Sequence, residues 1–177
     1  IPKPAPCSDA GHGNKKARKE WLLRMEHNLI HIIYNWIRFL DKDSPEDALE
    51  RLLVKFLEND CEKCDRLVEL LLGYDQRSRL AEYKFYRSDI EESLVKEEVE
   101  LAAMEAKLSG GGDFFHRLGA ISAFCCVHSK TCHAHILQQL TLQKSGIGIV
   151  KTAVEDFISV LEDGNQKVQL ISYLERI

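Results

Sequence analysis

The stretch RLLVKFLENDCEKCDRLVELLLGY, residues 51–74, holds two apolar repeats separated by a polar pair. Before Asn59 and Asp60, apolar residues recur every three or four positions, which is the spacing of one helix face. After the pair, the same spacing continues through Cys61, Cys64, Leu67, Val68, Leu71 and Leu72. An Asn-Asp pair here favours a helix break followed by a new N-cap. The stretch therefore predicts two short amphipathic helices joined by a tight turn as an antiparallel hairpin.

The chain before this stretch predicts an irregular start and then a long helix. Residues 1–15 contain three prolines and two glycines, and we expect a flexible lead-in or a loop between structural repeats. From about Lys16 to Leu40, apolar residues at helical spacing predict a helix of about seven turns with one buried face. That face comprises Trp21, Leu22, Met25, Leu29, Ile32, Ile33, Trp36, Ile37 and Leu40. Ser44 and Pro45 then favour the start of the next helix.

An acidic helix and a glycine run follow. Residues 74–87 are expected to continue as helix, and Ser88-Asp89 favours the start of another helix that ends before the glycines. Its apolar residues form a narrow stripe through Leu94, Leu101 and Leu108, and the remainder is strongly acidic. Residues 110–112 are expected to form a hinge or linker, since they lack the Lys-Ser/Thr of a phosphate-binding loop.

The last third of the chain predicts a C-terminal helical region over residues 113–177. Helix starts are favoured at Asp113, at Ser129 or Thr131, after Gly148 and after Gly164. No segment alternates with the period of two that marks a half-buried strand. We therefore expect an all-α protein, either a helix bundle or a right-handed stack of helix pairs and triplets, with residues 16–109 forming its first part.

Composition indicates one domain with a core and favours protein partners. The chain has 177 residues, of which 45% are hydrophobic and 29% charged, and its formal net charge is -4. Basic residues cluster between Lys15 and Lys19, whereas residues 46–105 carry 17 acidic and 9 basic side chains. This separation favours peptide or protein partners over direct nucleic-acid binding. The basic run fits a nuclear localisation signal or a plain flexible loop.

We expect neither a membrane span nor a secretory signal. No stretch approaches the roughly 20 consecutive apolar residues that a membrane helix needs, and the N-terminus lacks an apolar signal core. The six cysteines lie in helix-like segments and two of them are adjacent, which favours free thiols in a reducing, intracellular compartment over a disulfide framework. Since the chain begins with Ile1, we expect a fragment or a processed product.

Cysteine and histidine supply the metal-like patterns. Cys61 and Cys64 have the spacing of half a zinc site, but structural zinc takes four ligands. Because residues three apart share a helix face, packing in the core is the first interpretation of this pair, with zinc or redox chemistry as alternatives. The stretch CCVHSKTCHAH, residues 125–135, is denser in candidate ligands. It crosses a predicted helix end, so we expect Cys125 to face the core and Cys126 to point elsewhere.

No pattern indicates catalysis. His27 and His31 lie four apart but lack the glutamate that metalloproteases place between two such histidines, so we expect a partly exposed pair beside the apolar face. No nucleophile, base and acid arrangement or paired carboxylates stand out. We therefore expect no catalytic residue, no cofactor and no metal ligand. The acidic helix Glu91–Glu105 is either a solvated face or a docking surface for basic peptides.

Residues 51–74 also resemble a known family. The matching positions are Lys55-Phe56, Glu58-Asn59-Asp60, Glu62-Lys63 and Asp65-Arg66-Leu67. They resemble the C-terminal part of the beta-catenin-like family of nuclear armadillo-repeat proteins. The resemblance extends from about residue 20 to the end of the chain. It includes EHNLIHIIYNWIRFL, residues 26–40, and more loosely GIGIVKTAVEDFISVLEDG, residues 146–164.

The resemblance implies a fold and a function. It implies an armadillo/HEAT-like α-solenoid, with armadillo-like helices at 16–109 and a C-terminal helical capping region. The function implied is a non-enzymatic scaffold in the nucleus, within the spliceosome-associated nineteen complex of pre-mRNA splicing. The partners implied are splicing-complex proteins, including their basic nuclear-localisation-type segments, and no partner-binding residue carries over. Two alternatives stay open: a zinc-binding or thiol-redox domain built on residues 125–135, and a helical domain that self-associates.

Overall fold

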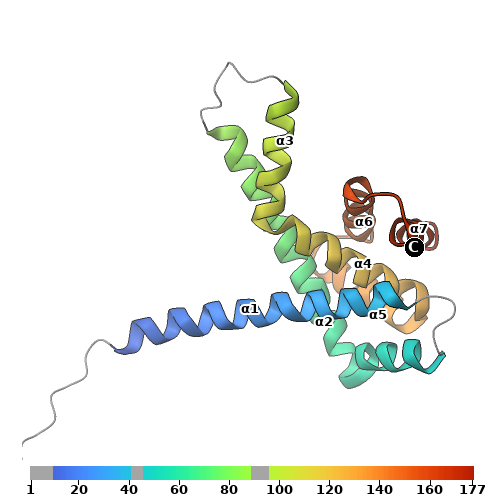
Figure 1. The fold of residues 1–177 in the computed structure, drawn as a ribbon. Coiled ribbons are helices and arrows are strands. Elements are labelled where there is room, and N and C mark those ends of the chain that lie inside the picture. Colours follow the sequence, from blue (N-terminus) through green and yellow to red (C-terminus); the bar gives the residue numbers. More distant parts are fainter. Residues whose placement is uncertain (1–9, 41–45, 89–95) are drawn as a thin grey trace, which may run out of the picture.

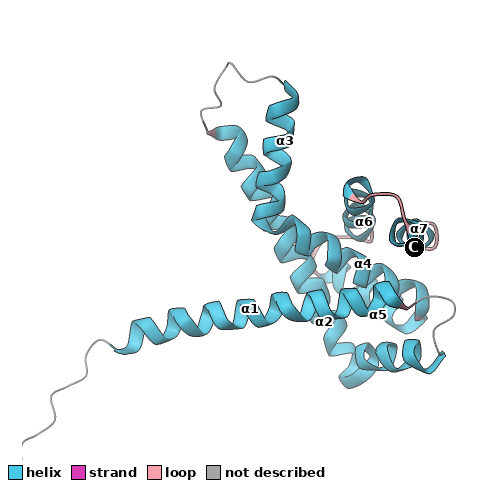
Figure 2. Cartoon of the chain, in the orientation of Figure 1, coloured by secondary structure: helices cyan, strands magenta, loops and turns pink. Residues whose placement is uncertain are grey.

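A computed structural model describes residues 10–40, 46–88 and 96–177. Within these ranges it has only helices, turns and loops, so the all-α prediction is confirmed (Figure 2). The elements are α1 (Ala10–Phe39), α2 (Glu46–Arg87), α3 (Lys96–Lys107), the π-helical turn η1 (Leu108–Gly112), α4 (Asp113–His128), α5 (Lys130–Leu142), α6 (Gly148–Val160) and α7 (Asn165–Leu174).

Helix α4 is the centre of the fold. Between Phe115 and Cys126 its side chains are buried all round, apart from the half-buried Arg117. A helix that is apolar on every side must be covered on every side, and α4 contacts α1, α2, α5, α6 and α7. Gly119 permits the approach of α6, because a Cβ at this position would lie 2.3 Å from Cβ of Ala153.

Helix α2 bends where the polar pair predicted a break. Glu58 to Cys61 have non-helical backbone angles, and Asn59, Asp60 and Cys61 are left-handed, with φ of 52°, 54° and 66°. The first segment runs across the second rather than back along it, so the expected antiparallel hairpin is wrong (Figure 1). Three successive left-handed residues redirect the chain more sharply than the single left-handed residue of an ordinary helix end. Beyond the kink, the helix continues through Gly73 to Arg87, as predicted.

The glycine run is a packed turn. The turn η1 joins α3 to α4 with one left-handed residue, Gly111, at φ 112°. A Cβ at Gly110 would lie 2.4 Å from Cβ of Ala81, and one at Gly111 would lie 2.7 Å from the Tyr74 ring. Glycine is required here because the turn lies directly against α2, and not because the chain needs an open linker. The division of the chain at 110–112 stays a prediction.

Helix α1 differs from its prediction at its start and in its buried face. It begins at Ala10, so residues 10–15 are helical rather than an irregular lead-in, and residues 1–9 lie outside the described part. No proline lies between Pro6 and Pro45, and two glycines cost a helix only about 1 kcal/mol each. Of the nine expected buried side chains, only Ile37 and Leu40 are fully buried, because the helix turns a neighbouring face to the core.

The start of α5 agrees with its prediction, and the buried side of α3 does not. Ser129 caps α5, since its side chain accepts a hydrogen bond from the Cys132 backbone N–H at 3.2 Å. Along α3, Leu101 is exposed and Ala103 is buried, because a small side chain permits close contact with α2. The expected start of this helix at Asp89 and its stripe residue Leu94 lie outside the described residues.

Candidate protein-interaction surface

The five cysteines of the described residues form a buried cluster where α2, α4 and α5 meet. Cys61 and Cys64 are 5% and 0% exposed, as the helical spacing predicted. The thiols of Cys64 and Cys132 are hydrogen-bonded, and Cys64 Sγ also lies 3.6 Å from the Phe56 carbonyl oxygen across the kink. Cys125 and Cys126 of α4 are buried beside them. The expectation that Cys126 points away from the core is wrong, because α4 is covered on all sides.

Burial raises the pKa of most of these thiols and makes them poor nucleophiles, whereas the hydrogen bond from Cys64 lowers the pKa of Cys132. Burial raises the pKa of Cys61 above its usual value and that of Cys126 to about 12. The hydrogen bond to Cys132, together with burial, raises the pKa of Cys64. Since the thiolate is the reactive form, the surroundings of Cys61, Cys64 and Cys126 fit packing side chains better than a redox centre.

The histidines of residues 125–135 do not join the thiols in a metal site. His128 packs on Phe124, with ring centres 4.8 Å apart, and His135 Nε2 lies 2.6 Å from Asp65 Oδ1. Across residues 10–40, 46–88 and 96–177, no group of three or more Cys, His, Asp or Glu side chains is placed to hold a metal ion. The dense sequence pattern therefore separates into buried thiols, a histidine that packs on an aromatic ring and a histidine that hydrogen-bonds a carboxylate.

His27 and His31 are also occupied by packing. His27 stacks on Phe114, with ring centres 3.9 Å apart, and its Nε2 lies 2.8 Å from the Tyr74 hydroxyl. Burial lowers the pKa of His27, which favours the neutral ring in this stack. His31 tilts onto the same phenylalanine at 5.3 Å. The two histidines thus fasten α1 to α4.

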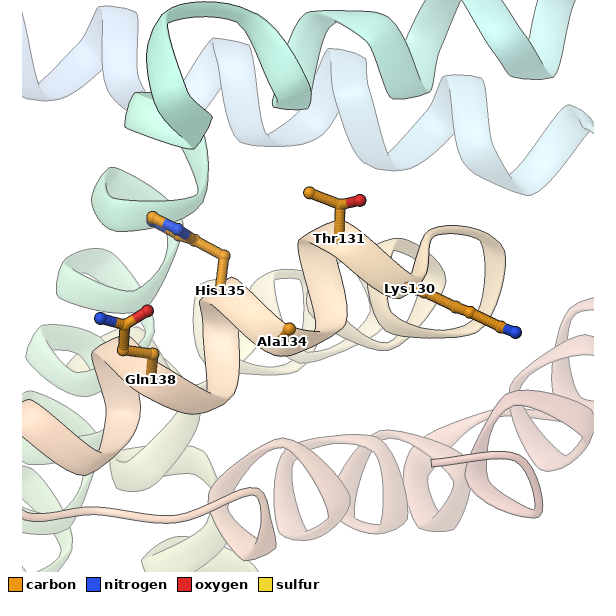
Figure 3. A pocket seen from close by; sticks show the side chains of 5 residues that line it. All are labelled: Lys130, Thr131, Ala134, His135 and Gln138. Atoms are coloured by element: carbon orange, nitrogen blue, oxygen red, sulfur yellow. The ribbon is translucent and has the colours of Figure 1, made fainter.

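A surface hollow of about 470 Å³ lies along α5 and is lined by Lys130, Thr131, Ala134, His135 and Gln138. All five residues come from this single helix, and their side chains diverge: His135 points toward α2 and Lys130 points away from it (Figure 3). Catalytic pockets converge polar groups from several elements on one point. This hollow has no such convergence, so it is not a candidate active site.

The polar positions of the 51–74 motif form a joint around the kink. Glu58 pairs with Lys55 at 2.6 Å and with Lys63 at 2.8 Å, so it ties one side of the kink to the other. These two hydrogen bonds lower the pKa of Glu58 to about 2. Asp65 contacts His135 of α5, and Arg66 contacts Glu26 of α1 at 2.8 Å. The motif therefore sets how α1 and α5 lie against α2.

The outer face of α1 is a long, exposed apolar surface among the described helices. We call it the α1 stripe; each of its side chains is between 42% and 72% exposed. It consists of Leu22, Met25, Leu29, Ile32, Trp36 and Phe39. Trp21 lies beside it and is 56% exposed. The stripe contains most of the side chains that the sequence predicted to be buried. The prediction therefore identified an apolar face of α1 correctly but expected it to be buried, whereas it is exposed.

Comparison with known proteins places the chain in a family. Residues 10–155 match the model of a family described as catenin-beta-like, Arm-motif containing and nuclear. The chain belongs to this catenin-beta-like family. Beta-catenin-like protein 1 of Homo sapiens is 26% identical over 147 residues, which cover 71% of this chain and 24% of the relative. The chain thus spans about a quarter of that relative's length.

These matches confirm the resemblance carried by the 51–74 motif. A family with an armadillo motif fits the all-α, solenoid-like arrangement of the described helices. The family description names a structural motif and a nuclear setting and no reaction. None of the described helices is long and apolar enough to cross a membrane.

Proposed function

We propose that this chain is a non-enzymatic protein-interaction module of a nuclear armadillo-type scaffold that works in pre-mRNA splicing. The α1 stripe carries the proposal: it is a large apolar face held on a fixed helical frame. The largest apolar patch on a monomeric protein is often functional, and an apolar patch with a polar rim marks an interaction site. The family's armadillo motif and nuclear description support the setting. The splicing assignment, to the nineteen complex, rests on the resemblance of residues 51–74.

The interior of the described helices supports a scaffold over an enzyme. Its buried titratable side chains, such as His116 and the clustered thiols, are held in aromatic stacking or in packing contacts. Catalytic groups instead face a cleft, with pKa values matched to proton transfer near neutral pH. The described helices therefore fit a protein that acts by binding other proteins at its surface.

The acidic helix α3 is a second candidate surface, for basic partner segments. Glu97, Glu98, Glu100 and Glu105 are exposed along it. Carboxylates in a row attract Lys-rich and Arg-rich peptides and set their register. We propose that basic, nuclear-localisation-type segments of splicing proteins bind here. Glu91 and Glu92, which belong to the same acidic run, lie outside the described residues.

Immunoprecipitation from nuclear extract tests the function. The cellular protein that carries these 177 residues is tagged and compared with a version lacking them. We expect the intact protein to recover splicing-complex proteins and the deletion to lose a defined subset. Recovery of the same set without this region would refute a role for the chain in assembly. Recovery of no splicing protein by either version would refute the splicing assignment.

A further inference from the structure

The spacing of the α1 stripe is that of a helix-pairing seam. Its six residues follow one another at intervals of three, four, three, four and three, which is the a/d repeat of a coiled coil. The repeat spans residues 22–39, a length of roughly 27 Å at 1.5 Å per residue. A seam of this kind fits another helix better than an extended strand or a small molecule.

The stripe is presented in a fixed orientation by the opposite face of α1. Ile30, Tyr34 and Ile37 are buried there, and the Tyr34 ring lies 5.5 Å from that of Phe157. The Gln169 side chain of α7 donates to the Ile37 carbonyl oxygen at 3.4 Å. Rotation of α1 to bury the stripe would break these contacts, so the core of this chain does not cover it.

The size of the stripe matches one helix. A large apolar side chain presents roughly 150–250 Å², so the fractional exposures amount to on the order of 600 Å² for the stripe. The largest apolar patch on an ordinary monomer is about 300–600 Å². Stable interfaces bury about 800 Å² on each partner. One docked helix that covers the stripe and part of its rim reaches that range.

The charge beside the stripe identifies the occupant. Toward the N-terminus, the same helix carries Lys15, Lys16, Arg18, Lys19 and Arg24, all exposed. Glu20 is the one acidic residue between residues 15 and 24, and it already faces Lys16 at 4.0 Å. This half of α1 reaches out past the other helices, at the blue end of the ribbon (Figure 1). The seam thus runs into a strongly basic end.

We propose that the α1 stripe docks an acidic amphipathic helix of a partner protein. The partner's apolar residues repeat every three and four positions, and its acidic residues lie beside Lys15 to Arg24. The inference rests on the proposed function, since it names the partner class of an interaction module. Apolar burial supplies most of the affinity, and the charges select the partner and its direction along α1.

A second copy of this chain is a poorer occupant. Two α1 helices would each bring five cations and one acidic residue over residues 15–24, so no complementary charge is available for the basic end. Like charges across a helix pair are unfavourable. An acidic helix removes this repulsion and uses the same seam.

Binding of two designed peptides to the full chain tests the proposal. Both peptides are helical, about five turns long, with leucine at the a and d positions. One carries glutamate and the other lysine at the flanking positions. Fluorescence anisotropy should show the acidic peptide binding at least about tenfold more tightly than the basic one, with the difference shrinking at high salt.

Two matched variants locate the site. Leu29→Gln with Ile32→Gln alters the stripe, while Leu142→Gln with Val168→Gln alters exposed apolar residues on α5 and α7. We expect the stripe variant to weaken binding of the acidic peptide at least about tenfold and the control to leave it unchanged. Circular dichroism melts should match for both variants, because all four side chains are exposed.

Several outcomes would overturn the inference. Equal binding of the two peptides, or binding that survives in the stripe variant, would show that an acidic helix is not the occupant of the α1 stripe. Sedimentation that shows a dimer lost in the stripe variant would make a second copy the occupant. Stripe-dependent binding to phosphatidylserine vesicles would make it a lipid surface. Peptide binding without any splicing protein in the immunoprecipitate would leave this inference standing and refute the proposed function.

Discussion

Replacing Gly110 with alanine distinguishes a hinge from a close-packed turn. The added Cβ would lie 2.4 Å from Cβ of Ala81 and 3.2 Å from the Arg77 carbonyl oxygen. Ordinary contact begins at 3.4 Å, so η1 and α2 must separate by about 1 Å. An open hinge would instead be stabilised by Gly110→Ala, since alanine restricts the unfolded chain.

The expected size of the effect follows from two opposing terms. Overpacking a close contact costs about 1–3 kcal/mol, and alanine in place of glycine returns up to about 1 kcal/mol of helix propensity. We therefore expect Gly110→Ala to lower the free energy of unfolding by about 0.5–2 kcal/mol. Ala81→Gly removes the opposing methyl group. The double variant should lose at least about 1 kcal/mol less than the two single losses combined.

Urea unfolding followed by the helical circular dichroism signal measures these differences. Gly73→Ala is the matched control, because it lies inside α2 and an added Cβ there meets nothing within 4 Å. It should raise the free energy of unfolding by about 0.5–1 kcal/mol. If Gly110→Ala proved as stabilising as Gly73→Ala, or if its effect added simply to that of Ala81→Gly, the packed turn would be refuted.

Three further predictions concern protons, metal and charge. Burial lowers the pKa of His116 below its usual 6.5, so the unfolded chain binds more protons and the free energy of unfolding falls as pH drops through that value. His116→Phe should flatten this fall in urea melts repeated at stepped pH. Because no group of three or more Cys, His, Asp or Glu side chains in the described part of the chain is placed to hold a metal ion, a chelator should leave the melting temperature unchanged, and mass spectrometry should find less than about a tenth of a zinc per chain. Charge reversal of Glu91, Glu92, Glu97 and Glu98 should weaken the binding of a basic peptide at low salt at least about tenfold. The same reversal of Glu155, Glu162, Asp163 and Glu175 should leave the binding unchanged. Equal loss of affinity in both variants would contradict a site on α3.

The α1 helix shows what periodicity can and cannot establish. Apolar residues at helical spacing predicted the helix and one apolar face correctly. Yet α1 has a second apolar arc, through Ile30, Tyr34 and Ile37, and this arc is the one that packs in the core. Spacing within one helix cannot choose between two apolar arcs, since the choice depends on which neighbours arrive. Here Phe114 and Phe157, far along the chain, decide it.

The long-range contacts of the joint around the α2 kink could not be predicted from the sequence, for a related reason. Asp65 and His135 are separated by 70 residues, and Glu26 and Arg66 by 40. Local pattern predicts which positions are polar but not which distant charge each one meets. The kink was predictable, because Asn59 and Asp60 are residues that adopt left-handed backbone angles more readily than most. The close approach of η1 to α2 was not, since a glycine run has the same appearance in a linker and in a packed turn.

The joint and the α1 stripe act as one unit. The Arg66–Glu26 pair is more than half exposed on its arginine side, so it contributes at most about 1 kcal/mol. Its effect is orientation: Glu26 follows Met25 of the stripe and also accepts from the Tyr74 hydroxyl at 3.1 Å. The neighbouring stack of His27 on Phe114 supplies the packing. The residues that identify the family therefore hold the apolar face of α1 outward, away from the core of the described helices.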